Sequence, residues 1–411
     1  MRDALFAIGV LLSTASQLRP EGAAVGPGEA CLLLWLGWIV VGSAAWDVPL
    51  TPALTRLLGF WAVFALAQAA GALMGMAIDN HRDTGSLLHD AIAYVLLACV
   101  SCLTVIEPGA AGRLRAAAWR LSIFGAALLI AQIANAWGAF SMPSVDPWYW
   151  DRLRGWSENP NQLALLCAVL ALLSLHLAET AGGTSRAVCA TVCAGIALYA
   201  GILTKSDAFY AVAMAGLVIF LILKVRSWLA SLGRELTLAA GFFWLVVISL
   251  PAIAIATAPF AIAVAQSAHD AATGVYQSDH EGEAAIRFSL WSEAWQRSVD
   301  SAFIGLGPGA HLVRTAYKRE PPPNFEAHNT FLDLLTQGGA LAVLGVVWLL
   351  VSSLLVPFRA RRAALTTLVC GLAIFSSFHL IVRLPIFWFA IAICLVPLPQ
   401  VVPPSATMTR R

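Results

Sequence analysis

The sequence predicts an all-α polytopic membrane protein with about 12 transmembrane helices and one large extramembrane loop that contains short amphipathic helices. Of its 411 residues, 59% are hydrophobic and 12% are charged, whereas a soluble domain has about 25% charged residues. The mean hydropathy is +0.78, and apolar runs recur along the chain. We therefore expect residues 1–411 to form a single integral membrane domain, and a large soluble catalytic domain is excluded.

Twelve apolar runs have the length of about 17–25 residues that a transmembrane helix needs. The predicted spans are 3–18, 30–46, 57–78, 87–106, 117–140, 159–178, 186–203, 208–224, 237–258, 335–357, 363–380 and 384–400. The first run follows Arg2 but lacks a clear small-residue cleavage site. We therefore interpret it as a span and not as a signal peptide.

The distribution of Lys and Arg predicts the orientation, because cytoplasmic segments of membrane proteins are enriched in basic residues. With the N-terminus inside, most basic residues outside the long loop fall in cytoplasmic segments, and most Asp and Glu residues fall on the other side. Both termini are therefore predicted to be cytoplasmic.

The composition also excludes several function classes. The formal net charge of +2 gives no general attraction to nucleic acid, and no nucleic-acid-binding pattern is present. All eight cysteines fall in apolar runs without nearby His or acidic residues, so we expect neither disulfides nor a metal site. The centres of the predicted spans hold no Asp or Glu, which argues against an ion-coupled transporter.

The loop 259–334, between the ninth and tenth predicted spans, is long enough to be functional. Within it, residues 284–300 place Ile286, Leu290 and Ala294 on one helical face, with two tryptophans on an adjoining stripe. This pattern predicts an amphipathic helix at the outer membrane interface. Arg287 lies on its polar side, at the level of a lipid phosphate.

A second informative region precedes the sixth predicted span. Asn159 is a good helix N-cap and Pro160 suits the first helical position, so both have a purely structural reading. Arg152 and Arg154 lie on the outer side, against the charge rule, beside a helix N-terminus that favours an anion. This region, including Asn161, is a candidate anion site.

Two further outer turns each have a structural and a functional reading. Lys205 and Asp207 form a tight turn that is either a solvated ion pair or a contact to phosphate. The segment Gly305-Leu306-Gly307-Pro308-Gly309 either makes a turn or cradles an anion with its backbone N–H groups.

The most specific local pattern surrounds His328. Thr330 and Asp333 have the spacing of a capping box, which predicts a membrane helix that starts at Thr330. A helix N-terminus disfavours an imidazolium, so His328 is expected to have a lowered pKa and to act as a base. The alternative is a loop histidine without a task, and Glu326 or Glu283 could be the base instead.

Four motifs occur in the order Arg154-Gly155-(x3)-Asn159-Pro160-Asn161, Arg287-(x3)-Trp291, Gly305-(x)-Gly307-Pro308-Gly309 and His328-Asn329-(x2)-Leu332. Together they resemble the O-antigen ligase and O-antigen polymerase family, which includes exopolysaccharide polymerases and protein O-oligosaccharyltransferases. The motifs cover residues from about 150 to 340. Outside that stretch the resemblance is limited to the number and hydropathy of the spans.

The resemblance implies a multi-helix enzyme of the bacterial inner membrane whose active site and large loop are periplasmic. Such an enzyme transfers a glycan from undecaprenyl pyrophosphate to an acceptor hydroxyl, without a metal or other cofactor. Its partners would be the lipid-linked glycan donor, a glycan or lipid A core acceptor, membrane lipids and, as a further candidate, a chain-length regulator.

The family's functional residues map onto this chain individually. The loop arginine maps onto Arg287, the histidine onto His328, and a further arginine onto Arg154, with Arg152 as a close substitute. Asn159, Asn161 and Asn329 lie within the motifs and are candidate substrate-binding residues. Many members have Ser-Arg where this chain has Ser206-Asp207, and Lys205 is the candidate replacement for that missing cation.

These residue types suit direct displacement at an anomeric carbon with inversion. Arginines stabilise a pyrophosphate leaving group bidentately, which can substitute for a metal ion, and a histidine activates the acceptor hydroxyl. The rival hypotheses are a polytopic glycolipid flippase or exporter, which needs a basic cavity at mid-membrane, and a non-catalytic subunit of a polysaccharide-secretion complex. The choice between polymerase and ligase stays open.

Overall fold

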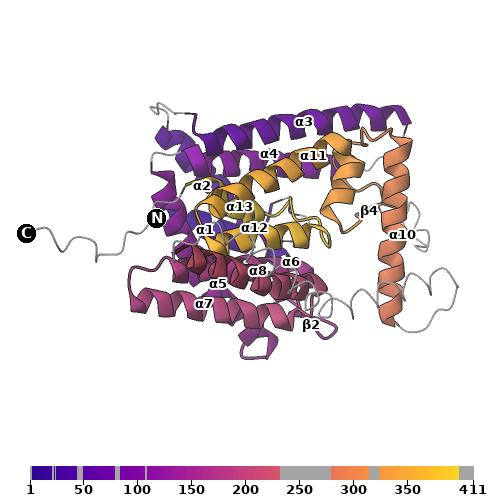
Figure 1. Cartoon of the computed structure of the whole chain (residues 1–411). Helices are drawn as coiled ribbons and strands as arrows, with labels where there is room; N and C mark the ends of the chain where they lie inside the picture. Colours follow the sequence, from indigo (N-terminus) through magenta and orange to yellow (C-terminus); the bar gives the residue numbers. More distant parts are fainter. Residues whose placement is uncertain are drawn as a thin grey trace, which may run out of the picture.

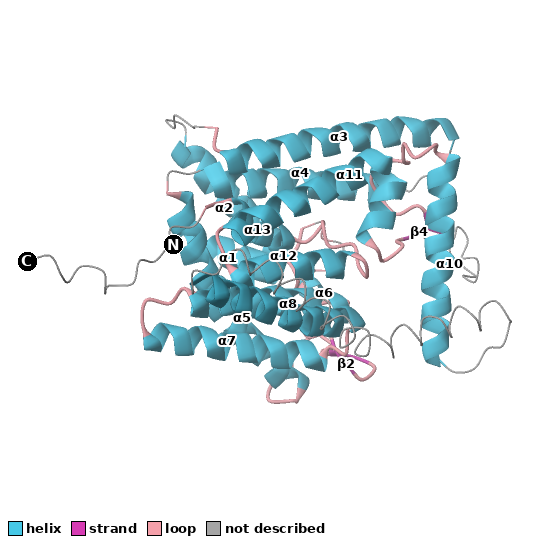
Figure 2. Cartoon of the chain, in the orientation of Figure 1, coloured by secondary structure: helices cyan, strands magenta, loops and turns pink. Residues whose placement is uncertain are grey.

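The computed structural model describes residues 2–20, 23, 25–43, 50–78, 84–106, 109–231, 279–313 and 324–397 (Figure 1). The ninth predicted span, 237–258, the loop residues 259–278 and the side chain of Glu283 lie outside the described residues. Almost all the described secondary structure is helical, as Figure 2 shows, and the strands are short.

The described helices account for most of the chain and are named in sequence order. They are α1 (Arg2–Leu12), a short 3-10 helix (Ser16–Leu18), α2 (Pro27–Ser43), α3 (Pro52–Ile78), α4 (Thr84–Ile106), α5 (Ala110–Ala136), α6 (Pro160–Glu179), α7 (Thr184–Leu203), α8 (Asp207–Ser231), α10 (Asp279–Asp300), α11 (Thr330–Arg359), α12 (Ala363–Ser376) and α13 (Pro385–Leu395). Two antiparallel strand pairs join β1 (Trp148–Tyr149) to β2 (Arg152–Leu153) and β3 (Leu312–Val313) to β4 (Asn324–Phe325).

Helix α6 lies at the centre of the bundle and contacts α5, α7 and α12. Most of its side chains are buried, although it is apolar on every face. Other helices, such as α3 and α11, leave large apolar side chains exposed, among them Leu66 and Leu344. A helix that is apolar all round must be buried in protein or face lipid, and both cases occur here. The chain is a multi-pass membrane protein.

The expected twelve spans are not confirmed. Among the described residues, 7 helices are long and apolar enough to cross a membrane: α3, α4, α5, α6, α7, α8 and α11. Helix α1 has 11 residues and α2 has 17. At 1.5 Å per residue, an 11-residue helix covers roughly half of a hydrocarbon core of about 30 Å.

The last two predicted spans, 363–380 and 384–400, are shorter helices than expected. Helix α12 has 14 residues and α13 has 11, and almost all their side chains are buried inside the bundle. Hydropathy cannot distinguish such protein-buried segments from lipid-facing ones. The residues 377–384 between them are irregular, and a membrane protein tolerates non-helical backbone where it is packed against protein.

Helix α11 breaks at Gly339, whose φ of 63° lies in the left-handed region. The break frees the carbonyl groups of Thr336 and Gln337, which accept hydrogen bonds of 2.7 Å from the backbone N–H groups of Leu306 and Gly307. The glycine segment 305–309 is therefore a turn that packs on α11. Because these two N–H groups are used, they do not cradle an anion.

The predicted amphipathic helix 284–300 is confirmed as α10, which starts five residues earlier, at Asp279. In Figure 1 it runs across one end of the bundle, crosswise to α3 and α7. Its predicted apolar stripe is buried against the residues before α11, where Leu290 and Ala294 pack on Leu312 and Ala327. The stripe was expected to face the membrane interface, but periodicity identifies an apolar face and not its partner.

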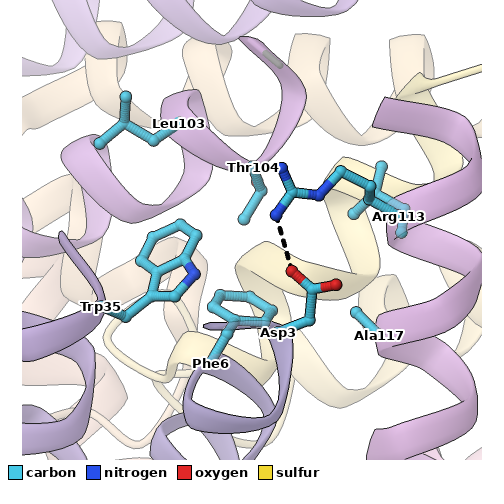
Figure 3. Close-up of a pocket in the computed structure, with 8 residues that line it drawn as sticks. Asp3, Phe6, Trp35, Leu103, Thr104, Arg113 and Ala117 are labelled. Carbon is cyan, nitrogen blue, oxygen red and sulfur yellow. Dashed lines mark hydrogen bonds and ion pairs between the residues drawn. The ribbon is translucent and has the colours of Figure 1, made fainter. Parts of the chain in front are cut away.

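The other end of the bundle is held by ion pairs. Asp3, at the start of α1, accepts hydrogen bonds from Arg113 at 2.7 Å and from Arg120 at 3.3 Å, both on α5. Figure 3 shows the Asp3–Arg113 pair in a small pocket of about 30 Å³ with Phe6 and Trp35. Because these charged groups pair with each other, we interpret them as structural contacts that hold α1 against α5.

The break in α11 gives a stability prediction. We expect Gly339→Ala to lower the melting temperature in detergent, with a loss of about 1–3 kcal/mol, because the positive φ is strained for alanine and the new Cβ would collide with the Phe303 carbonyl. Gly345→Ala on the same helix is the control, since its nearest contact would be Phe60 at 3.7 Å. Equal melting temperatures for the two variants would contradict this account.

Candidate active site

A cavity of about 650 Å³ lies at the end of the bundle where α1 ends and α6 and α11 begin. Its polar part is lined by His328, His379 and Arg383. Its apolar part is lined by α2 and α4, including Leu33 and Leu88, which are about half exposed on the surface. The cavity therefore connects a polar site with the lateral, apolar surface of the protein.

His328 lies in the turn that leads into α11. The helix begins at Thr330 as predicted, but the N-cap is Asn329, whose side-chain oxygen accepts hydrogen bonds from Phe331 N–H at 3.0 Å and Leu332 N–H at 3.3 Å. The expected capping role of Thr330 is thus wrong. Its hydroxyl instead donates to the carbonyl of His379, since the irregular segment 377–384 packs on this turn.

A second histidine faces His328. The ring centroids of His328 and His379 are 6.0 Å apart. Burial lowers the pKa of His328, the carboxylate of Glu326 opposes this change, and the positive charges of Arg287 and Arg383 lower the pKa further. Burial and the charge of Arg287 also hold the pKa of His379 well below its usual value. Both imidazoles are therefore neutral near pH 7 and can accept a proton.

Arg287, on α10, is half-buried and acts electrostatically on both histidines. Its guanidinium forms no hydrogen bond or ion pair with any other described residue. A half-buried cation beside two neutral imidazoles leaves positive charge at the site. Such a charge favours binding of an anion, and a guanidinium suits a phosphate.

Arg152, on β2, lies close enough to His379 for its charge to lower the pKa of that imidazole. Its guanidinium donates to the side-chain oxygen of Asn161 at 3.0 Å and to the carbonyl of Thr204 at 3.2 Å. Ser206 donates to the same Asn161 oxygen at 2.8 Å. These partners are neutral, so they do not balance the positive charge of Arg152.

The predicted cap of α6 is confirmed. Asn159 is the N-cap, its side-chain oxygen accepts a hydrogen bond of 2.9 Å from Asn161 N–H, and Pro160 is the first helical residue. Asn159 thus has the structural role that its position predicted, and its side chain also lines the cavity.

Two other predicted cations are paired away from the histidines. Arg154 donates to Asp146 at 2.7 Å and stacks over the ring of Tyr149. The ammonium of Lys205 lies 2.5 Å from Asp151, and both of these side chains are largely exposed. The structure therefore brings Arg152, and not Arg154 or Lys205, into the group around His328.

An ion-pair network beside His328 was not predicted from the sequence. Arg383 donates to both oxygens of Asp90, at 2.8 and 3.1 Å, and to the carboxylate of Glu326. The side chain of Asp90, on α4, is only 3% exposed. One signal was available, since the predicted topology puts Arg383 in a short segment on the outer side, where basic residues are depleted. Asp90 and His379 gave no such signal.

The fold and the site define a class of protein, a multi-pass membrane protein with a group of arginines and histidines at one end of its bundle. Residues 192–347 match the family model described as O-antigen ligase. This match confirms the resemblance for that region, which contains Arg287, Asn329 and His328, and it supports a function of the O-antigen ligase type. Arg152 and Arg383 lie outside the matched residues. No curated protein matches the chain.

Proposed function

We propose that the protein is a membrane glycosyltransferase that moves a glycan from undecaprenyl pyrophosphate to an acceptor sugar hydroxyl. The reaction takes place at the periplasmic face of the bacterial inner membrane, and it either polymerises repeats or attaches glycan to lipid A core. The observation that carries this proposal is the half-buried guanidinium of Arg287 beside the neutral imidazoles of His328 and His379. The O-antigen ligase match of residues 192–347 supports it.

The arginines bind and stabilise the leaving group. A polyprenyl pyrophosphate gains negative charge as the bond to the anomeric carbon breaks, and fixed guanidinium groups stabilise that charge without a metal ion. The N–H groups of Arg287 donate to no other described residue. The partners of Arg152 are neutral, so its positive charge is not balanced by a carboxylate among them. Arg287 and Arg152 are therefore the pyrophosphate ligands in this mechanism.

His328 is the general base. It takes the proton of the acceptor hydroxyl while the hydroxyl oxygen forms a bond to the anomeric carbon and the pyrophosphate leaves from the opposite face. This displacement inverts the anomeric configuration. Glu326 is a weaker candidate because its carboxylate is already paired with Arg383.

The shape of the cavity suits a lipid-linked substrate. Its polar end holds His328 and His379, and its apolar end reaches the lateral surface beside Leu33 and Leu88. A polyprenyl chain could remain in the bilayer while its head group enters the polar end. The rival flippase hypothesis has less support, because the charged residues that line the cavity, such as Arg19 and Glu326, lie at helix ends and in connecting segments.

Substitutions at the two central residues test the proposal. In a strain that lacks the protein, Arg287→Ala and His328→Ala should each reduce surface glycan by at least about 100-fold, which is the usual effect of removing one transition-state contact or base. Arg287→Lys should also be impaired, because a point charge cannot reproduce a bidentate fork. Surface and lipid-linked glycans on a gel provide the measurement.

The matched control is Arg297→Ala on the same helix, where the arginine pairs with Glu293 at 3.8 Å. This variant should retain wild-type glycan. Single repeats left on the carrier would identify a polymerase, and lipid-linked polymer with bare lipid A core would identify a ligase. Wild-type glycan in His328→Ala would exclude the catalytic mechanism in favour of the flippase or the non-catalytic subunit.

The pKa of His328 predicts the pH dependence. A general base must be neutral, and the pKa of His328 is lowered from 6.5, so the fall of kcat/KM at acid pH should be centred below 6.5. Glu326→Gln removes the carboxylate that raises this pKa, so it should move the fall to still lower pH. A pH–rate profile that falls above 6.5, or that is unchanged by Glu326→Gln, would exclude His328 as the base.

A further inference from the structure

We propose that Trp291 and Asp333 are positioning residues that fix the imidazole of His328 relative to the guanidinium of Arg287. This inference rests on the proposed function, because it assigns these two residues a role in the same reaction. Neither side chain needs to touch the substrate. Each acts on the backbone that carries His328.

Asp333 holds the backbone from the side of α11. Its carboxylate is almost fully buried, and its two oxygens accept hydrogen bonds from Ala327 N–H at 2.6 Å and from Asn329 N–H at 3.1 Å. These are the residues directly before and after His328. The φ of His328 is 53°, a left-handed conformation that costs a non-glycine residue about 1–2 kcal/mol. The carboxylate offsets that cost.

Trp291 holds the same turn from the side of α10. Its indole N–H donates to the carbonyl of Ala327 at 2.9 Å. Trp291 follows Arg287 by four residues, so the two side chains project from adjacent turns of one helix face. The hydrogen bond therefore links the helix that carries the arginine to the turn that carries the histidine.

Together the two contacts fix both torsion angles of His328. The peptide group before His328 is held through the Ala327 carbonyl by Trp291, and the peptide group after it is held through the Asn329 N–H by Asp333. Because φ and ψ describe the rotations of these two peptide groups about the Cα atom, neither can change freely. The direction of the Cα–Cβ bond that carries the imidazole is therefore fixed by these two contacts.

A small apolar cluster completes the connection. Leu290 and Ala294 of α10 are buried against Leu312 of β3 and against Ala327. This cluster is separate from the main core of the bundle. Helix α10 is thus packed on the segment that leads to His328, and a movement of α10 would displace Arg287 and this segment together.

Positioning residues should affect the rate of reaction more than the binding of substrate. A displacement of about 1 Å at a reacting group can lower a rate by about 100-fold. Trp291→Phe keeps the ring in the apolar cluster and removes only the N–H donor. Asp333→Asn keeps the volume but can accept only one of the two N–H groups, because its NH₂ is itself a donor.

The experiment uses the purified full-length protein in liposomes with a defined polyprenyl-pyrophosphate-linked saccharide as donor. We expect Trp291→Phe and Asp333→Asn to lower kcat by about 10- to 100-fold, with the KM for the donor changed less than about threefold. The controls are Trp295→Phe and Asp300→Asn, whose side chains are both exposed on α10, and both should retain wild-type kcat.

The outcomes separate this inference from the proposed function. Wild-type kcat in Trp291→Phe, or a loss fully explained by less folded protein on size-exclusion chromatography, would overturn the positioning role while His328→Ala stays inactive. If Asp333→Asn fails to fold, Trp291→Phe alone decides. Activity in His328→Ala would overturn the proposed function itself, and the positioning role with it.

Discussion

The break in α11 at Gly339 is the constraint on which the site depends. Two backbone carbonyls, those of Thr336 and Gln337, lose their helical partners there and would be costly to leave unpaired inside a membrane protein. The turn at residues 305–309 supplies their hydrogen-bond donors. That turn follows α10 directly, so satisfying the broken helix also brings α10 across the end of the bundle, close to the start of α11.

Both the end and the middle of α10 are then tied to α11. The turn after α10 is bound to the break, and Trp291 in the middle of the helix is bound to the residue before His328. Arg287 and His328, which are 41 positions apart in the sequence, come together through these local contacts. These contacts are backbone hydrogen bonds, one side-chain hydrogen bond from Trp291 and a small apolar cluster, so the arrangement does not depend on a large interface.

The cations near the site fall into two groups. Arg154, Lys205 and Arg383 each have a carboxylate partner, which neutralises them and fixes their position. Arg287 and Arg152 have no carboxylate partner among the described residues. The second group leaves positive charge around His328 and His379. On this difference we propose that Arg287 and Arg152 bind an anionic substrate and that Arg383 has a structural role.

The sequence predicted the helix caps and helix starts, which depend on residues a few positions apart. The cap and first residue of α6, the start of α11 and the existence of α10 follow from residue types at fixed spacing. The sequence could not decide between Arg152 and Arg154, which are two residues apart, because the choice depends on where Asn161 and Asp146 lie in the fold. Asp90 lies on α4, whereas His379 and Arg383 lie in the segment 377–384, so only the tertiary structure shows that these two parts of the chain meet.

We propose that arginine and histidine side chains perform the transfer without a metal ion. The direct measurement is the release of undecaprenyl pyrophosphate from a purified lipid-linked saccharide donor by the purified protein in excess EDTA. The rate of undecaprenyl pyrophosphate release should be the same with and without EDTA and should not increase when magnesium is added. A rate that is lost in EDTA and restored by magnesium would contradict this proposal.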